Sequence, residues 1–121
     1  MRVLDLKTME GYKRRIMDTL LEKKLQAKGA VLIEGPKWCG KTTTAEEIAA
    51  SKIMLSKPDI KEHFKSLLEI DTDAALAGEA PMLIDEWQTV PKLWDAVRYT
   101  VDHRHKMGQF ILTGSAVPDK E

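Results

Sequence analysis

Eight consecutive residues in the first half of the chain have the types and spacing of an anion-binding segment. They run Gly35-Pro-Lys-Trp-Cys-Gly-Lys-Thr42. Glycine at positions 35 and 40 allows positive φ angles and lets the backbone approach an anion without a Cβ in the way. Successive backbone N–H groups then point inward, and a helix that begins at Lys41 adds unpaired amides and the positive end of its dipole. We therefore expect this segment to cradle a phosphate group.

The side chains at the end of this segment indicate a nucleoside triphosphate. Its spacing is the Walker A pattern, in which Lys41 reaches the β- and γ-phosphates and the Thr42 hydroxyl ligates Mg²⁺. An apolar run over about 30–34 and helix-forming residues after position 42 supply the strand–loop–helix context that the pattern requires. The alternative is a glycine-bearing turn that binds nothing. The predicted nucleotide-binding residues are Gly35, Pro36, Lys37, Trp38, Cys39, Gly40, Lys41, Thr42 and Thr43.

Two adjacent carboxylates form a second chemical element. Asp85 and Glu86 follow the apolar run Met82-Leu-Ile84. Ligands of open α/β sheets bind beyond the carboxyl ends of the strands, so this run is expected to deliver both acids to the phosphate segment. Asp85 is predicted to hold Mg²⁺ opposite Thr42, and Glu86 to orient or deprotonate an attacking water. Because turns are also rich in acids, this interpretation depends on the Walker A pattern in the same chain.

A third apolar run, Phe110-Ile-Leu112, ends in the polar residues Thr113 and Ser115 around a glycine. We predict that Thr113 senses the γ-phosphate by donating a hydrogen bond to it or to the lytic water. The alternative is a strand-end turn whose hydroxyls bond to the local backbone. The predicted catalytic residues are therefore Lys41, Glu86 and Thr113.

The composition fits one small cytoplasmic domain. The 121 residues carry 19 basic and 19 acidic side chains, so no net charge attracts the chain to nucleic acid or to an anionic membrane. No apolar run approaches the roughly 20 residues of a membrane helix. The single cysteine excludes an internal disulfide, which suits the cytoplasm.

Apolar periodicity predicts how these elements are connected. Helices are expected over about 12–28, 41–51, 58–68 and 89–106, with a short one over 74–76. Strands are expected over about 30–34, 53–55, 82–84 and 110–112. We therefore predict an α/β fold of the P-loop NTPase type, a three-layer sandwich with a parallel sheet of about four strands flanked by helices. Residues 1–11 are expected to be an N-terminal lead-in and residues 12–121 a partial ATPase domain.

The three elements together resemble a known family. Gly35-Pro-Lys-Trp-Cys-Gly-Lys-Thr42, Leu83-Ile-Asp-Glu-Trp-Gln88 and Phe110-Ile-Leu-Thr-Gly-Ser-Ala116 look like the AAA-type ATPase core of prokaryotic, largely uncharacterised ATP-binding proteins. The resemblance implies a sheet ordered 5-1-4-3-2, a later arginine finger and a nuclease-like C-terminal domain. The chain supplies no fifth strand after residue 112, so we interpret it as an N-terminal fragment or a reduced member. The strand over 30–34 would then be an unpaired edge, which favours self-association.

The leading functional prediction is Mg-ATP binding and hydrolysis at the β–γ bond. One alternative is a nucleotide-dependent switch or assembly module with little turnover, and a third is a P-loop small-molecule kinase. The kinase is disfavoured by Glu86, which suits water activation, and by the missing phosphate lid. The absence of an Asn-Lys-x-Asp run favours adenine over guanine. A role in nucleic-acid handling is expected only through regions outside this chain, and the process that ATP drives is not predicted.

Overall fold

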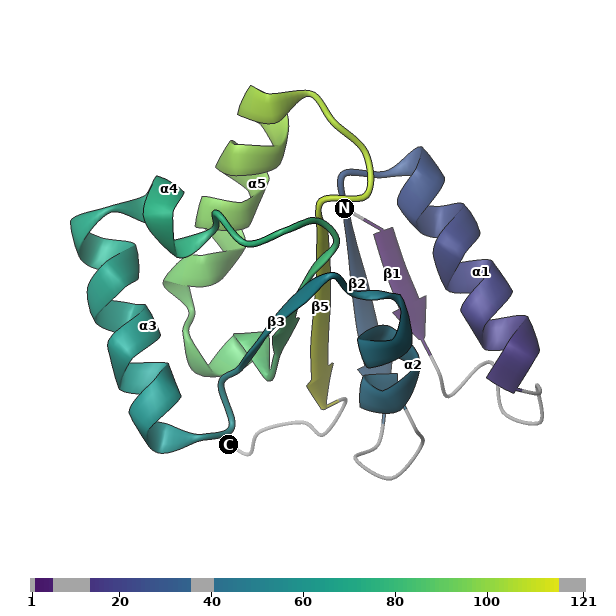
Figure 1. Ribbon diagram of the computed structural model, residues 1–121, viewed down its shortest axis with the longest axis horizontal. Coiled ribbons are helices and arrows are strands. Elements are labelled where there is room, and N and C mark those ends of the chain that lie inside the picture. The colour runs from purple at the N-terminus through teal and green to yellow at the C-terminus, as the bar shows by residue number, and fades with distance from the viewer. Residues whose placement is uncertain (1, 6–13, 36–40, 116–121) are drawn as a thin grey trace.

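Five parallel strands form one sheet at the centre of the molecule (Figure 1). The computed structural model describes residues 2–5, 14–35 and 41–115. The sheet order is β1-β2-β5-β4-β3, with all neighbouring pairs parallel. The strands are β1 Arg2–Asp5, β2 Ala30–Gly35, β3 Ser51–Met54, β4 Met82–Asp85 and β5 Phe110–Ser115. The predicted α/β class is confirmed, and the sheet has five strands where we expected about four.

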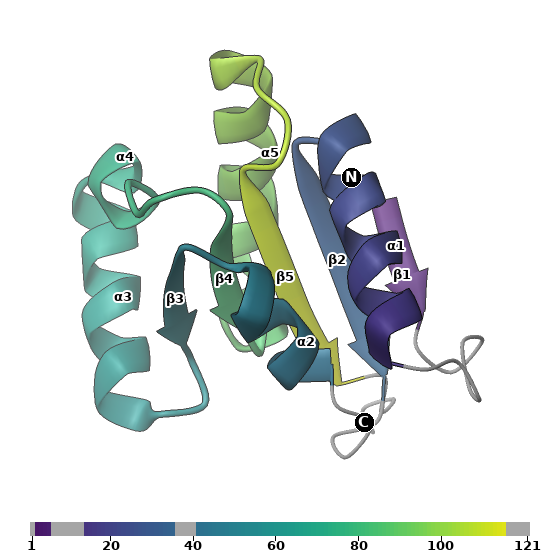
Figure 2. The same cartoon turned by 45° about the vertical axis from the view of Figure 1, so that its right-hand side comes forward.

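Helices cover both faces of this sheet, as Figure 2 shows most clearly. Helices α1 and α2 lie on one face, and α3, α4 and α5 on the other. Their bounds are α1 Arg14–Ala27, α2 Lys41–Ile48, α3 Pro58–Ile70, α4 Thr72–Ala75 and α5 Lys92–Arg104, with a 3₁₀ turn, η1, over Trp87–Thr89. Among these described helices, we find none whose length and hydropathy would let it cross a bilayer. The result is the expected three-layer sandwich.

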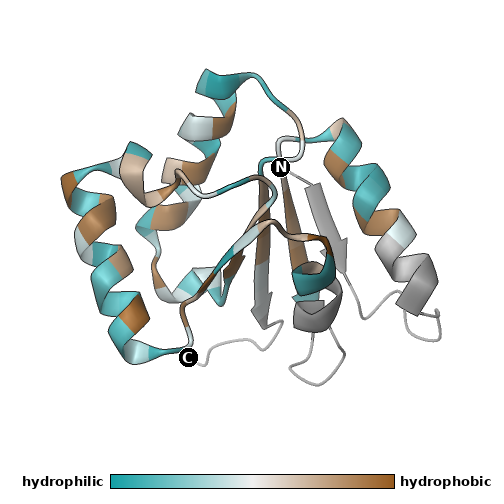
Figure 3. Cartoon of the chain, viewed as in Figure 1, coloured by the Kyte–Doolittle hydropathy of each residue, from teal (hydrophilic) through white to brown (hydrophobic). Residues whose placement is uncertain are grey.

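Strand alternation divides the core into two layers. Side chains at successive strand positions point to opposite faces of a sheet. Thus Leu32, Ile84 and Leu112 pack with the α3–α5 layer, whereas Ile33, Leu83 and Ile111 pack with α1 and α2. Strands β2, β4 and β5 carry buried apolar residues on both faces, as expected for a parallel sheet covered on both sides. Figure 3 shows the hydrophobic colour along most of β2.

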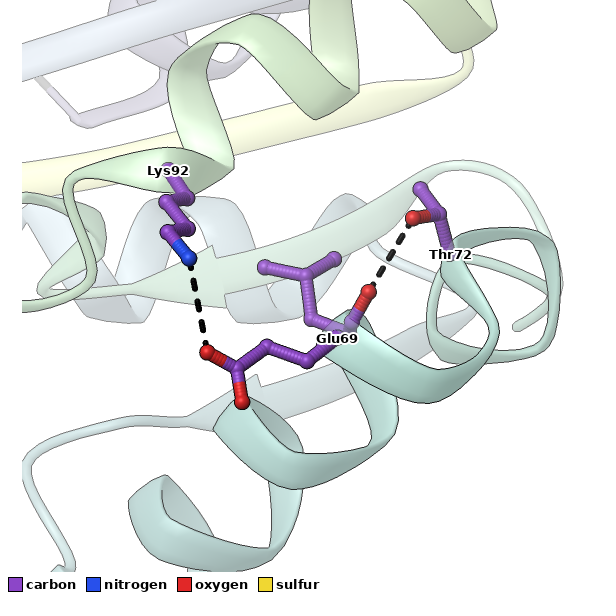
Figure 4. A network of polar contacts seen from close by, with 4 residues as sticks. Glu69, Thr72 and Lys92 are labelled. Atoms are coloured by element: carbon purple, nitrogen blue, oxygen red, sulfur yellow. Dashed lines mark hydrogen bonds and ion pairs between the residues drawn. The ribbon is translucent and has the colours of Figure 1, made fainter.

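Polar contacts join the helices of the larger layer (Figure 4). The Lys92 Nζ lies 3.4 Å from Glu69 Oε2, which links the start of α5 to α3. The Thr72 hydroxyl donates to the Leu68 carbonyl oxygen at 3.0 Å, and the Asp71 side chain caps α4 by accepting from the Ala74 amide at 3.2 Å. The lysine–glutamate pair is exposed on both sides, so we expect it to contribute little to stability.

The expectation of an unpaired edge at residues 30–34 is wrong. Strand β1 pairs in parallel with β2, with Val3 opposite Leu32 and Leu4 opposite Ile33. The position that the resemblance assigned to a later strand is thus filled by residues of the predicted lead-in. Consequently the backbone groups on this side of β2 are satisfied within the chain, and an unpaired β2 no longer supports self-association.

Candidate active site

Two of the predicted site residues meet at the carboxyl edge of the sheet. Asp85 ends β4 and lies opposite Thr113 of β5 in the parallel register. The Thr113 hydroxyl donates to Asp85 Oδ1 at 2.6 Å, across 28 positions of sequence. Asp85 is 6% exposed and Thr113 is fully buried. A buried hydrogen bond to a carboxylate contributes about 1.5–3 kcal/mol, so Thr113 holds this acid firmly.

Helix α2 begins at the same edge. Strand β2 ends at Gly35 and α2 begins at Lys41, and the helix packs against β2, β4 and β5. Asp85 and Thr113 lie two positions beyond Leu83 and Ile111, so they face the same side of the sheet as α2. The backbone N–H groups at the start of α2 are therefore on the side and at the edge where the acid lies.

The remaining phosphate-segment predictions fall outside the described residues. Pro36, Lys37, Trp38, Cys39 and Gly40 lie there entirely. The helix places the backbone of Lys41, Thr42 and Thr43 in its first turn, but their side chains also lie outside what is described. The strand–loop–helix context that we required of the Walker A pattern is nonetheless present, because β2 and α2 flank the segment.

Glu86 has an unusual backbone conformation. Its φ of 58° and ψ of 47° place it in the left-handed region, which glutamate seldom adopts. The η1 turn that follows holds it there, because both the Thr89 amide and the Thr89 hydroxyl donate to the Glu86 carbonyl oxygen, at 3.1 and 2.9 Å. Asp85 is buried beside Thr113 whereas Glu86 is half-buried, so the two adjacent acids have different surroundings.

Gln88 contacts the carboxylate of Glu86. Its Nε2 donates to Glu86 Oε1 at 2.7 Å. The sequence gives no sign of this bond. It does show the glycine between Thr113 and Ser115, and a glycine inside a strand commonly marks a close approach of other groups. A Cβ added to Gly114 would lie 2.6 Å from Gln88 Oε1 and 3.0 Å from Trp87 Nε1.

The described acids suit magnesium bound together with a phosphate. Among residues with described side chains, no cluster of three or more histidine, cysteine, aspartate or glutamate side chains could hold a metal by itself. Mg²⁺ is usually bound by one or two carboxylates with substrate phosphates and waters completing its shell. A single buried aspartate at the start of α2 fits that donor set, with Thr42 as the second predicted ligand.

The two arginines with described side chains lie at the opposite end of the strands. Arg104 donates to Gln109 Oε1 at 3.1 Å and to the Leu76 carbonyl at 3.0 Å, just before β5 begins. Arg98 lines a small pocket with Gly29 and Ala30, where β2 begins. Neither of these two side chains is therefore close to Asp85.

The fold and this edge together have the architecture of a P-loop NTPase. A family model described as an AAA domain matches residues 27–120. The chain belongs to this AAA domain family, which confirms the resemblance stated from the sequence.

Two similar proteins from mycobacteria carry no assigned activity. Uncharacterised proteins of Mycobacterium tuberculosis and Mycobacterium bovis are each 31% identical to this chain over 107 residues. The match covers 88% of this chain and 24% of each relative, so the chain spans about a quarter of their length. No solved structure matches the chain significantly.

Proposed function

We propose that this chain binds Mg-ATP and contributes to its hydrolysis at the β–γ bond. The observation that carries the proposal is the buried Asp85–Thr113 pair, 2.6 Å apart, on the face and at the edge where α2 begins. A carboxylate on the side of the sheet where a helix begins would normally compete with an anion for that helix N-terminus. Next to a Walker A segment it instead supplies the negative ligand that a phosphate-bound cation needs.

The proposed roles follow the order of the elements. The amides of residues 35–43 and the Lys41 ammonium bind the phosphates, and Thr42 with Asp85 binds Mg²⁺. The bound cation would neutralise charge that develops on the phosphate oxygens. Glu86 orients the attacking water and accepts its proton.

The proposed role of Thr113 has a specific constraint. A threonine hydroxyl has one proton to donate, and here that proton is directed to Asp85. A γ-phosphate would therefore have to compete with Asp85 for it. We propose that Thr113 senses the nucleotide through Asp85. The same carboxylate would ligate Mg²⁺ and accept the hydrogen bond from Thr113, so binding of Mg-ATP would affect that hydrogen bond.

A second candidate function is a nucleotide-dependent switch with little turnover. It is favoured by the position of Arg98 and Arg104 at the far end of the strands. Loss of a catalytic arginine lowers phosphoryl-transfer rates by about 10³–10⁵-fold. An arginine supplied by another copy or by a partner would restore the rate. We therefore propose that self-association, where it occurs, serves to supply this arginine.

Phosphate release measured over a wide range of protein concentrations separates the two functions. If a second copy supplies the arginine, the rate per chain rises steeply with concentration. A measurable rate that stays constant per chain shows hydrolysis by the single copy and contradicts supply by a second one. Bound ATP without phosphate release at any concentration favours the switch.

The matched region makes up about a quarter of each relative, so the activity of a whole protein of that length would involve further regions. The process driven by ATP and any contact with nucleic acid would depend on those further regions. A cytoplasmic location is likewise part of this proposal and follows from its use of ATP.

A further inference from the structure

We propose that Gln88 is a positioning residue for Glu86 and that Gly114 of β5 keeps Gln88 in place. This inference rests on the proposed hydrolysis, in which Glu86 acts on the attacking water. It adds a residue that the Walker patterns do not contain, and it links that residue to the strand that carries Thr113.

The first observation is that residues of the η1 turn form hydrogen bonds to both the carboxylate and the main-chain carbonyl of Glu86. The Gln88 amide bonds to one carboxylate oxygen at 2.7 Å, and Thr89 bonds twice to the Glu86 carbonyl. Hydrogen bonds to a carboxylate are stronger than those between neutral groups. In catalytic sites, the side chain that acts as the base is itself oriented by a further hydrogen-bonding group.

The second observation is the space at Gly114. An ideal Cβ built on this residue would lie 2.6 Å from Gln88 Oε1, closer than a real Cβ contact allows. The oxygen of the Gln88 amide thus lies against the β5 backbone while its nitrogen reaches Glu86. The side chain of Gln88 bridges β5 and the Glu86 carboxylate, and any residue larger than glycine at 114 would displace it.

The third observation is the packing of Trp87 on the same turn. Its ring lies against Gly114, and its centroid is 5.0 Å from that of Trp94 in α5. The turn is therefore fixed between β5 and α5. Gln88 itself is exposed, so it is not needed to fill the core.

Together these contacts show that two consecutive residues of β5 help to position the two adjacent acids. Thr113 bonds directly to Asp85, and Gly114 receives the glutamine that bonds to Glu86. Two adjacent acids at the end of β4 are thereby positioned by two adjacent residues of the neighbouring strand. A shift of β5 would move both acids together.

The consequence is a specific kinetic effect. Removal of the Gln88 amide leaves the acid present but less well oriented, and misplacement of a catalytic group by about 1 Å can cost on the order of 100-fold in rate. We expect Gln88→Ala to lower the single-turnover rate at least about tenfold. Gly114→Ala should act in the same direction, because its methyl group displaces the glutamine.

The test is single-turnover hydrolysis of Mg-ATP with the 121-residue chain in excess. It compares wild type, Gln88→Ala, Gly114→Ala and the double variant Glu86→Gln/Gln88→Ala. Gln26→Ala, at an exposed glutamine of α1, is the matched control. Affinity for Mg²⁺ with a non-hydrolysable ATP analogue is measured for each variant, together with circular dichroism to confirm folding.

The expected result is slower hydrolysis in both single variants, unchanged affinity for the analogue, and no further loss when Gln88→Ala is added to Glu86→Gln. The positioning role is overturned if Gln88→Ala hydrolyses ATP at the wild-type rate or faster. It is also overturned if Gln88→Ala causes the same loss of rate in the Glu86→Gln background as in wild type. Either result leaves the proposed hydrolysis itself standing. Analogue binding without turnover in the wild type overturns the proposed hydrolysis and, with it, this inference.

Discussion

Replacement of Glu86 by glutamine is expected to lower the rate of ATP hydrolysis by about 10²–10⁴-fold with Mg-ATP binding nearly unchanged. The amide has the same shape as the carboxylate but accepts no proton from water. Its oxygen can still accept the hydrogen bond from Gln88, and the bonds from Thr89 go to the Glu86 main chain, which the substitution does not change. The variant should therefore keep its fold and its nucleotide affinity.

Phosphate release under single-turnover conditions measures this effect, with equilibrium titration of Mg-ATP beside it. Glu69→Gln is a suitable control, because Glu69 is an exposed acid whose ion pair joins α3 to Lys92 at the start of α5 (Figure 4). A rate in Glu86→Gln within about twofold of wild type would remove Glu86 from the mechanism. Weaker nucleotide binding at an unchanged rate constant would assign it to binding instead.

The second large effect is expected from Asp85→Asn. The asparagine side chain keeps an oxygen that can accept from Thr113, so the buried contact is retained while the negative charge is lost. A bound cation supplies several kcal/mol of charge stabilisation in phosphoryl transfer. Weakening its ligation should lower turnover by more than about 100-fold at millimolar Mg²⁺.

The dependence of turnover on Mg²⁺ concentration tests this role. We expect the midpoint for Mg²⁺ to move to much higher concentration in Asp85→Asn and to stay in place in Asp71→Asn. The latter is a matched exchange at the N-cap of α4, where either residue caps well. Equal Mg²⁺ midpoints in Asp85→Asn and wild type would show that this acid does not ligate the cation.

Much of the fold could be predicted because its signals are local. Pro58 begins α3, Asp71 caps α4, and short apolar runs mark β2, β4 and β5. Strand β1 could not be predicted because four residues, Arg2–Asp5, are too few to show alternation. Its place is decided by pairing with β2, which is a long-range contact that leaves no mark on the local sequence.

The site could be predicted in part for the same reason. The apolar runs place both Asp85 and Thr113 at the carboxyl edge, but their hydrogen bond depends on the register of β4 against β5, which the sequence does not reveal. We expected the next helix to begin near residue 89, yet Thr89 lies in η1 and α5 begins at Lys92. The turn follows the left-handed Glu86, and its residues Trp87 and Gln88 lie against Gly114 of β5. This contact between residues far apart in the chain leaves no mark on the local sequence.

Calorimetric titration of Mg-ATP into the chain and into Lys41→Ala tests the proposed nucleotide site more directly than any rate. Lys41 is the first residue of α2 and the lysine of the Walker A pattern. We predict saturable binding by wild type that is lost in the variant while its circular dichroism is unchanged. Equal binding by both chains, or no binding by wild type, would show that this edge of the sheet is not a nucleotide site.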